Sequence, residues 1–130
     1  MDAQTHTNLL SALQSEAFAC ARYLLMADEA REEGDAEAAE LLDGISRIGL
    51  REHFAELAKL ADPVRGDADN IVGAIYDESR QREDSYRLFA QQAEAAGEHQ
   101  VAQLFERIRA DKRDHVRALE AELERLEVPT

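Results

Sequence analysis

The chain of 130 residues has one cysteine, two prolines, no tryptophan and no long apolar run. A lone cysteine, Cys20, excludes an intrachain disulfide and is typical of a reducing compartment, so we expect a cytoplasmic protein. No stretch approaches the ~18–20 apolar residues of a membrane-spanning helix. The first residues also lack the basic segment that opens a signal peptide. The sequence therefore predicts a protein without a membrane partner.

Basic residues are scarce relative to acidic ones. The 15 Lys and Arg face 28 Asp and Glu, which gives a formal net charge of −13. This balance argues against nucleic acid or an anionic membrane surface as a partner. The chain is also poor in β-branched residues and rich in Ala, Leu, Glu, Gln and Arg, which favours helix. At this length we expect one domain, residues 1–130.

Apolar residues recur at spacings of three and four in four segments, which is the signature of helices with one buried face. We expect helices at about 8–33, 36–61, 70–96 and 98–127. Gly34 and Gly97 end the first and third of them, and Asp35 is a candidate N-cap for the second. The segment 63–69 is the long non-helical connection. The sequence therefore predicts an all-α protein.

The two halves, about 8–61 and 70–127, repeat each other. Glu16 and His53 are 37 positions apart, and so are Glu78 and His115. Two repeated helical hairpins with apolar stripes predict a four-helix bundle, with these four residues in one layer at its middle. A polar layer on an otherwise apolar face marks the candidate functional site.

The repeat offset changes along the chain, which predicts two irregular helices. The turns recur after 63 positions, whereas the Glu and His positions recur after 62. The simplest account is one extra residue between 42 and 53 and another between 78 and 86. A π-bulge accommodates a single inserted residue inside a helix. We therefore predict one π-bulge in each of these segments.

The connection between the halves limits how they join. If the middle helices run parallel, it must span roughly 24 Å at 1.5 Å per helical residue. Nine extended residues reach about 30 Å, so a crossover is possible but taut. A taut crossover also favours exchange of helices between two chains. We predict a homodimer, with helix exchange as one way of forming it.

Lys112 shares the apolar face of the last helix with His115, and Asp111 lies at the edge of this face. A buried ammonium needs an acidic partner, because desolvating an unpaired charge costs several kcal/mol. Glu16 and Glu78 are the acidic residues expected to face it. Cys20 lies one turn after Glu16 and is expected near the same layer.

These segments resemble the diiron domain of the rubrerythrin family, within the ferritin-like superfamily. The resemblance covers nearly the whole chain and rests on four stretches: 15–23 with Gly34, 51–53, 77–78 with Tyr86, and 111–115. It implies a ferritin-like four-helix bundle of two pseudo-repeated hairpins joined by a short crossover. It also implies an ancestral role in peroxide reduction and protection against oxidative stress. The implied metal ligands and second-layer tyrosines are Glu16, His53, Glu78, His115, Tyr23 and Tyr86.

The chain departs from the family pattern at three ligand positions. Leu50 and Lys112 stand where each Glu-x-x-His motif of the family begins, and Gln81 stands where the family has a further Glu. Two divalent ions beside Glu16, Glu78 and Lys112 would leave a net charge of roughly +3 in a medium of low dielectric constant. The sequence therefore favours a metal-free site over a full diiron centre.

Three functions stay open at this point. The first is a rubrerythrin-like protein with a degenerate, metal-free or metal-poor site, whose buried Glu, His and Lys cluster also suits a small-molecule ligand. The second is a mononuclear iron or zinc oxidoreductase that uses His53 and His115, with Asp111 as a further carboxylate. The third is a structural or partner-binding bundle. The sequence does not decide whether the chain is an enzyme.

Overall fold

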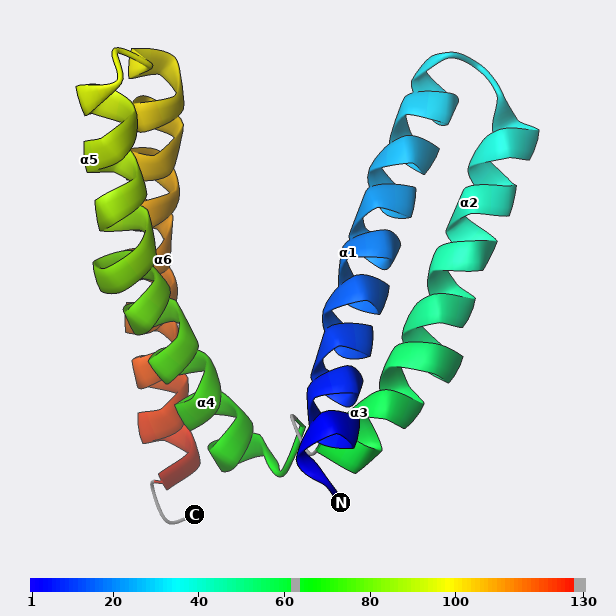
Figure 1. Cartoon of the computed structure of the whole chain (residues 1–130), viewed down its shortest axis with the longest axis horizontal. Coiled ribbons are helices and arrows are strands. Elements are labelled where there is room, and N and C mark those ends of the chain that lie inside the picture. Colours follow the sequence, from blue (N-terminus) through cyan, green and yellow to red (C-terminus); the bar gives the residue numbers. More distant parts are fainter. Residues whose placement is uncertain (62–63, 128–130) are drawn as a thin grey trace. The chain divides into compact units, whose positions relative to one another are not determined.

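The computed structural model describes residues 1–61 and 64–127, and within these ranges it contains helices and no strand. None of these helices combines the length and apolar character needed to cross a membrane. The all-α prediction is confirmed. Along the chain the elements are α1 (Ala3–Glu32), α2 (Ala36–Ile48), η1 (Gly49–Phe54), α3 (Ala55–Ala61), α4 (Asp67–Arg80), η2 (Gln81–Tyr86), α5 (Arg87–Ala95) and α6 (His99–Glu127) (Figure 1).

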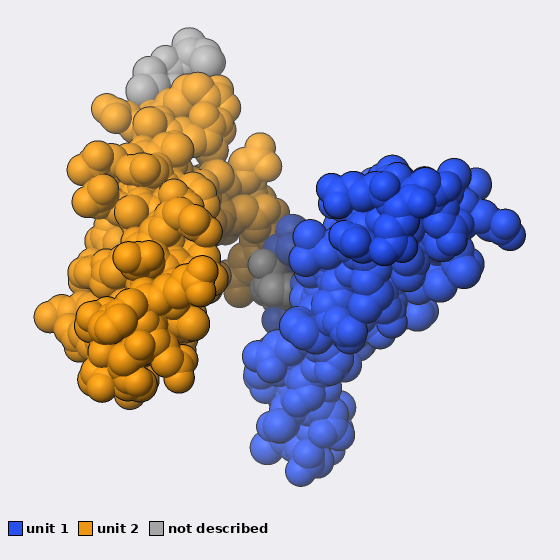
Figure 2. Space-filling model, turned by 90° about the horizontal axis from the view of Figure 1, so that it is seen from above, with its two compact units in different colours: residues 1–64 blue, residues 65–130 orange. Residues whose placement is uncertain are grey.

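The chain divides into two compact units, which Figure 2 colours separately. Unit 1 comprises residues 1–64, and in it α1 packs along α2, η1 and α3. Unit 2 comprises residues 65–130, and in it α4, η2 and α5 pack along α6. Each unit is therefore a hairpin of two long helical arms. One domain over residues 1–130 stays a prediction.

Both hairpins turn by the same glycine motif. Gly34 and Gly97 have φ angles of 83° and 79°, a left-handed conformation that costs a residue with a Cβ atom free energy. In unit 1 the Asp35 amide donates to the Ala30 carbonyl at 2.8 Å. In unit 2 the Glu98 amide makes the matching bond at 2.9 Å. These bonds satisfy carbonyls at the helix end, as a Schellman motif does. The predicted helix ends at both glycines are confirmed.

The helix starts are determined by polar residues, and two of them differ from the prediction. Helix α1 begins at Ala3 and not near residue 8, because the Asp2 side chain accepts a 2.8 Å hydrogen bond from the Thr5 amide and caps the helix. Helix α4 begins at Asp67 and not near residue 70, with acidic residues in its first turn, where the helix dipole favours them. The predicted connection 63–69 is therefore too long, and Pro63 lies outside the described residues.

Two π-helical segments bring the polar residues of each hairpin into register. Glu16 lies 18 positions before Gly34, whereas His53 lies 19 after it. In unit 2 the order is reversed: 19 positions separate Glu78 from Gly97, and 18 separate Gly97 from His115. In each hairpin the longer arm contains the π segment, η1 or η2, which absorbs the extra residue. Both predicted π-bulges are confirmed.

Small residues dominate the packing inside each hairpin. The described residues include no large side chain that is fully buried. The buried apolar residues are Leu9, Leu13, Cys20, Ala27, Ala30, Ala39, Ala58, Ala90, Ala102 and Val116. Alanine lets two helices approach closely but buries little apolar area, so most of the larger apolar side chains remain accessible within their own unit.

Candidate functional site

Unit 1 contains the first predicted pair. Glu16 on α1 and His53 in η1 face each other, with 3.5 Å between His53 Nδ1 and Glu16 Oε2. The predicted proximity is confirmed. The imidazole, however, is 57% exposed within its unit, because a two-helix hairpin offers it only one neighbouring helix. The expectation of a buried imidazole is therefore not met inside unit 1.

Cys20 and Ser46 link α1 to α2 beside this pair. The buried Ser46 hydroxyl donates to the Cys20 carbonyl at 3.0 Å, and the Cys20 thiol lies 3.5 Å from the Ser46 carbonyl. A Cβ atom built on Gly49 would meet Cys20 Sγ at 3.0 Å and Glu16 Oε2 at 3.4 Å. Gly49 therefore lets the π segment approach α1 at the level of Glu16. Cys20 therefore lies beside Glu16, as predicted.

Unit 2 contains the second pair together with a cation. Lys112 Nζ on α6 donates to Glu78 Oε2 on α4 at 3.1 Å, and His115 Nδ1 lies 3.4 Å from the same oxygen. The Lys112 side chain is only 13% exposed, whereas His115 is 59% exposed within its unit. The expected acidic partner of Lys112 is thus Glu78. Contact of Lys112 with Glu16, which lies in the other unit, stays a prediction.

Aromatic rings line the Lys112 side of this cluster. Lys112 Nζ lies 5.6 Å from the centre of the Tyr86 ring, a cation–π distance. The Tyr86 ring contacts Phe89 and Phe105, with centroids 6.0 Å apart in each pair. These rings hold the half-buried Tyr86 at the end of η2. The ammonium is therefore held by a carboxylate and by an aromatic face.

The other residues predicted for the layer are exposed or half-buried within their units. Leu50, Gln81 and Asp111 are exposed within their units, and Tyr23 is half-buried on α1. Asp111 makes no hydrogen bond or ion pair within the described part of the chain, so its recruitment as a ligand stays a prediction. The gathering of all these residues in one layer stays a prediction as well.

The donor side chains of each unit are too few to hold a diiron centre. Among residues 1–61 and 64–127, no three or more His, Cys, Asp and Glu side chains gather closely enough to hold one. Each unit supplies one carboxylate and one imidazole, and in unit 2 an ammonium group already lies on the carboxylate. These residues do not fit the family's diiron centre, which takes a Glu from two helices and Glu-x-x-His from two more.

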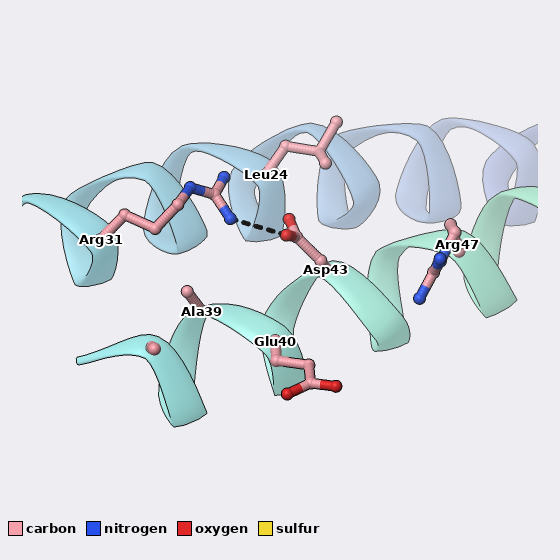
Figure 3. Close-up of a pocket in the computed structure, with 7 residues that line it drawn as sticks. Leu24, Arg31, Ala39, Glu40, Asp43 and Arg47 are labelled. Carbon is pink, nitrogen blue, oxygen red and sulfur yellow. Dashed lines mark hydrogen bonds and ion pairs between the residues drawn. The ribbon is translucent and has the colours of Figure 1, made fainter. Parts of the chain in front are cut away.

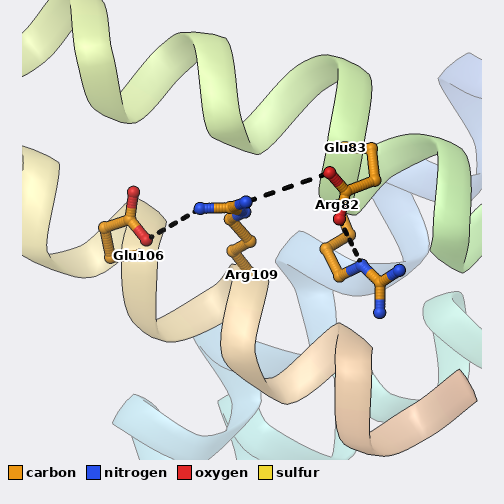
Figure 4. A network of polar contacts seen from close by, with 4 residues as sticks. All are labelled: Arg82, Glu83, Glu106 and Arg109. Carbon is orange, nitrogen blue, oxygen red and sulfur yellow. Dashed lines mark hydrogen bonds and ion pairs between the residues drawn. The ribbon is translucent and has the colours of Figure 1, made fainter. Parts of the chain in front are cut away.

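Unit 2 contains a second polar network, which the sequence did not predict (Figure 4). Arg109 on α6 lies between two acids, 3.4 Å from Glu106 and 3.9 Å from Glu83 in η2, and Glu83 accepts from Arg82 at 2.9 Å. With Arg113 these residues line an open hollow of ≈ 350 Å³. Glu83 in the π segment thus links η2 to α6 through Arg109.

A hollow of unit 1 lies between α1 and α2 and is lined by residues that include Leu24, Arg31 and Asp43 but neither Glu16 nor His53 (Figure 3). Arg31 donates to Asp43 across it at 2.7 Å and to Asp28 at 2.6 Å. Hydrogen bonds to Asp43 and then Asp28 raise the pKa of the Arg31 guanidinium. These groups pair with each other across a shallow, open surface. The ion pair between Arg31 and Asp43 therefore links α1 to α2.

Comparison of the sequence with models of known protein families found no match, and neither did comparison with curated protein sequences.

Proposed function

We propose that this chain is a rubrerythrin-like protein whose diiron site has degenerated into a metal-free or metal-poor polar cluster. In unit 2 the cluster comprises Glu78, Lys112 and His115, and in unit 1 the corresponding residues are the pair Glu16 and His53. The single observation that supports this proposal best is the 3.1 Å contact between Lys112 Nζ and Glu78 Oε2. The resemblance to the rubrerythrin family supports the proposed ancestry. The chemistry of the side chains now present supports the proposed loss of the metal ions.

Electrostatics explains why this contact opposes a metal ion. A divalent cation on Glu78 would lie within a few ångströms of the Lys112 ammonium. Two unit charges about 4 Å apart interact by about 4 kcal/mol at an effective dielectric constant near 20, and a divalent ion doubles this. The half-buried Lys112 side chain is held by Glu78 and by the Tyr86 ring. Metal binding would therefore have to displace the ammonium or remove its proton.

The side chains of the cluster are suited to binding polar ligands and to exchanging protons without a metal ion. Glu78 Oε2 accepts from Lys112 and lies beside His115 Nδ1, so a proton can move between groups that already touch. Acids and bases gathered on one face are typical of sites that bind small polar molecules or exchange protons with them. We propose that the cluster serves such a ligand, while peroxide reduction remains the family's ancestral role.

Elemental analysis tests this proposal. The full chain is produced with supplemented iron, zinc and manganese, desalted, and analysed for metal per chain. We expect metal far below one ion per chain. A stoichiometric content with peroxide reduction would overturn the proposal, because it would require carboxylates other than Glu16 and Glu78 to complete a centre.

A mononuclear site in unit 1 is the second candidate. Leu50 stands there at the repeat position of Lys112, so the described residues of unit 1 place no lysine on the Glu16–His53 pair. A carboxylate and an imidazole begin a zinc or iron(II) site that further ligands would complete. This candidate predicts one ion per chain that His53→Ala removes. Equal metal content in wild type and His53→Ala would rule it out, with His115→Ala as the matched variant in unit 2.

A further inference from the structure

Unit 2 contains a hollow of ≈ 350 Å³ whose charged lining residues are three arginines and two glutamates. We call it the arginine hollow, and its lining is Arg82, Glu83, Glu106, Arg109, Ala110 and Arg113. All of these residues belong to unit 2, so one hairpin forms the hollow by itself. Its lining has a net charge of +1, although the whole chain has a formal net charge of −13. The hollow is therefore a positive site on an acidic protein.

The arginine hollow lies on the polar side of α6. At about 100° per residue, Arg113 lies about 100° and Glu106 about 120° around the helix from Lys112, in the same direction. Phe105 and Ile108 lie within about 40° of Lys112 and belong to the apolar stripe. The polar side of an amphipathic helix is the side that faces water. An anion from solution can therefore reach the hollow without entering the Lys112 cluster.

The internal repeat shows that a hairpin of this kind does not need these charges. At the offset of 63 positions by which the turns recur, Glu83 corresponds to Cys20 and Arg109 to Ser46. In unit 1 the small, buried Cys20 and Ser46 link the two arms at this level. In unit 2 a carboxylate and a guanidinium link the arms beside the open hollow. The charged pair is not required to join the arms, which points to a use for its charge beyond packing.

The arginines of the hollow retain hydrogen-bond donors for a ligand. Arg82 donates to Glu83 through Nε, and its two Nη atoms have no partner among the described residues (Figure 4). Arg109 makes only long contacts, 3.4 Å to Glu106 and 3.9 Å to Glu83. Charge-assisted hydrogen bonds are shorter, at about 2.7–2.9 Å. Arg113 makes no hydrogen bond or ion pair within residues 1–61 and 64–127.

We propose that the arginine hollow binds the phosphate group of a small molecule, with Arg82, Arg109 and Arg113 as donors. The planar fork of N–H groups on arginine matches the oxygens of a phosphate. Arg109 and Arg113 lie one turn apart on α6, where like charges repel each other, and a bound anion removes this repulsion. The hollow is near the lower limit of about 300 Å³ for ligand pockets, which fits free phosphate or a small phosphate monoester. The proposal does not depend on the function of the Lys112 cluster.

Isothermal titration calorimetry of the full chain with inorganic phosphate, at constant ionic strength, tests the proposal. We expect saturable binding of one phosphate per chain, which Arg113→Gln weakens about tenfold. Arg107→Gln is the matched control, because it removes the same charge from α6 but Arg107 does not line the hollow. Absence of saturable binding to the wild type, or equal weakening by Arg113→Gln and Arg107→Gln, would overturn the proposal.

The wild-type chain provides a second test that no misfolded variant can obscure. In NMR titrations with inorganic phosphate and with methyl phosphate, the Nε–H signals of Arg82, Arg109 and Arg113 should shift, and that of Arg107 should not. Tighter binding of methyl phosphate would identify a phosphate monoester as the ligand, and equal binding would identify the free ion. Equal shifts of all arginine signals would show charge screening without a site and would overturn the proposal.

Discussion

Lys112 and Glu78 form the ion pair on which the proposed function depends. Their side chains are 13% and 25% exposed, so water screens them less than it screens a surface pair. Removing one partner leaves the other charge half-buried without its counterion, which is costlier than losing the pair as a whole. The strength of this pair is therefore the first property to measure.

Lys112→Met is expected to lower the free energy of unfolding by about 1–3 kcal/mol. Lys59→Met is the control: Lys59 pairs with Glu56 at 3.0 Å, but both side chains are highly exposed, and we expect a loss of about 0–1 kcal/mol. Urea denaturation followed by circular dichroism measures both variants. Combining Lys112→Met with Glu78→Gln should recover much of the loss. Equal effects of Lys112→Met and Lys59→Met would show that the Glu78 contact contributes no more than a surface pair.

Gly49 and Gly44 provide a second comparison at the residue scale. A Cβ atom at Gly49 would meet the buried Cys20 Sγ at 3.0 Å, whereas one at Gly44 would meet nothing within 4 Å. Gly44→Ala is expected to stabilise the protein by about 0.5–1 kcal/mol through helix propensity. Gly49→Ala is expected to destabilise it by about 1 kcal/mol through overpacking. Thermal unfolding measures the difference, and adding Cys20→Ala should relieve the Gly49→Ala defect.

Much of the residue-scale site was predictable from the sequence. The equal spacing of the two Glu–His pairs, together with the repeat, brought Glu16 to His53 and Glu78 to His115. The link between Cys20 and Ser46 was not predictable, because a serine inside a helix carries no signal of the carbonyl that it binds. Burial of the two imidazoles stays a prediction, because it requires four packed helices and each unit by itself contains two helical arms.

At the scale of the elements, the two hairpins differ in how their second helix begins. In unit 1 the Asp35 side chain accepts a 3.0 Å hydrogen bond from the Ala38 amide. In unit 2 the corresponding residue is Glu98, whose backbone carbonyl accepts from the Ala102 amide but whose side chain caps nothing in the described structure. An N-cap of Asp, Asn, Ser or Thr contributes about 0.5–2 kcal/mol.

This difference predicts opposite effects at matched positions. Asp35→Ala is expected to lower the free energy of unfolding by about 1 kcal/mol, because it removes a formed cap. Glu98→Asp is expected to raise it by up to about 1 kcal/mol, because it brings the carboxylate within reach of the same amide position. Chemical denaturation measures both. Loss of stability in Glu98→Asp would contradict the equivalence of the two turns.

The elements were more predictable than their ends. Both glycine turns and both π segments followed from the repeat, because a change of one residue in its offset has few structural solutions. The start of α1 was missed because its first turn is polar and shows no apolar periodicity. The start of α4 was missed because Asp67 and Asp69 were interpreted as loop residues, although acidic side chains also favour the first turn of a helix.

At the scale of the whole molecule, each hairpin has a small core of its own. The buried residues are few and mostly small, so each hairpin alone orders many residues for little apolar burial. Much apolar surface therefore remains open on each hairpin taken by itself. The sequence repeat predicts a polar layer. It does not predict what packs on the exposed apolar faces of the helices, because the spacing of residues within one helix does not identify the partner of that helix.

The central claim is that the Lys112 ammonium takes the place of a metal cation at Glu78. The most direct test is metal stoichiometry of wild type beside Lys112→Glu, both produced with supplemented iron and zinc and desalted together. The variant places a carboxylate one turn before His115 and removes the opposing charge. We expect negligible metal in wild type and about one ion per chain in the variant. Stoichiometric metal in wild type that is unchanged in Lys112→Glu would contradict the account.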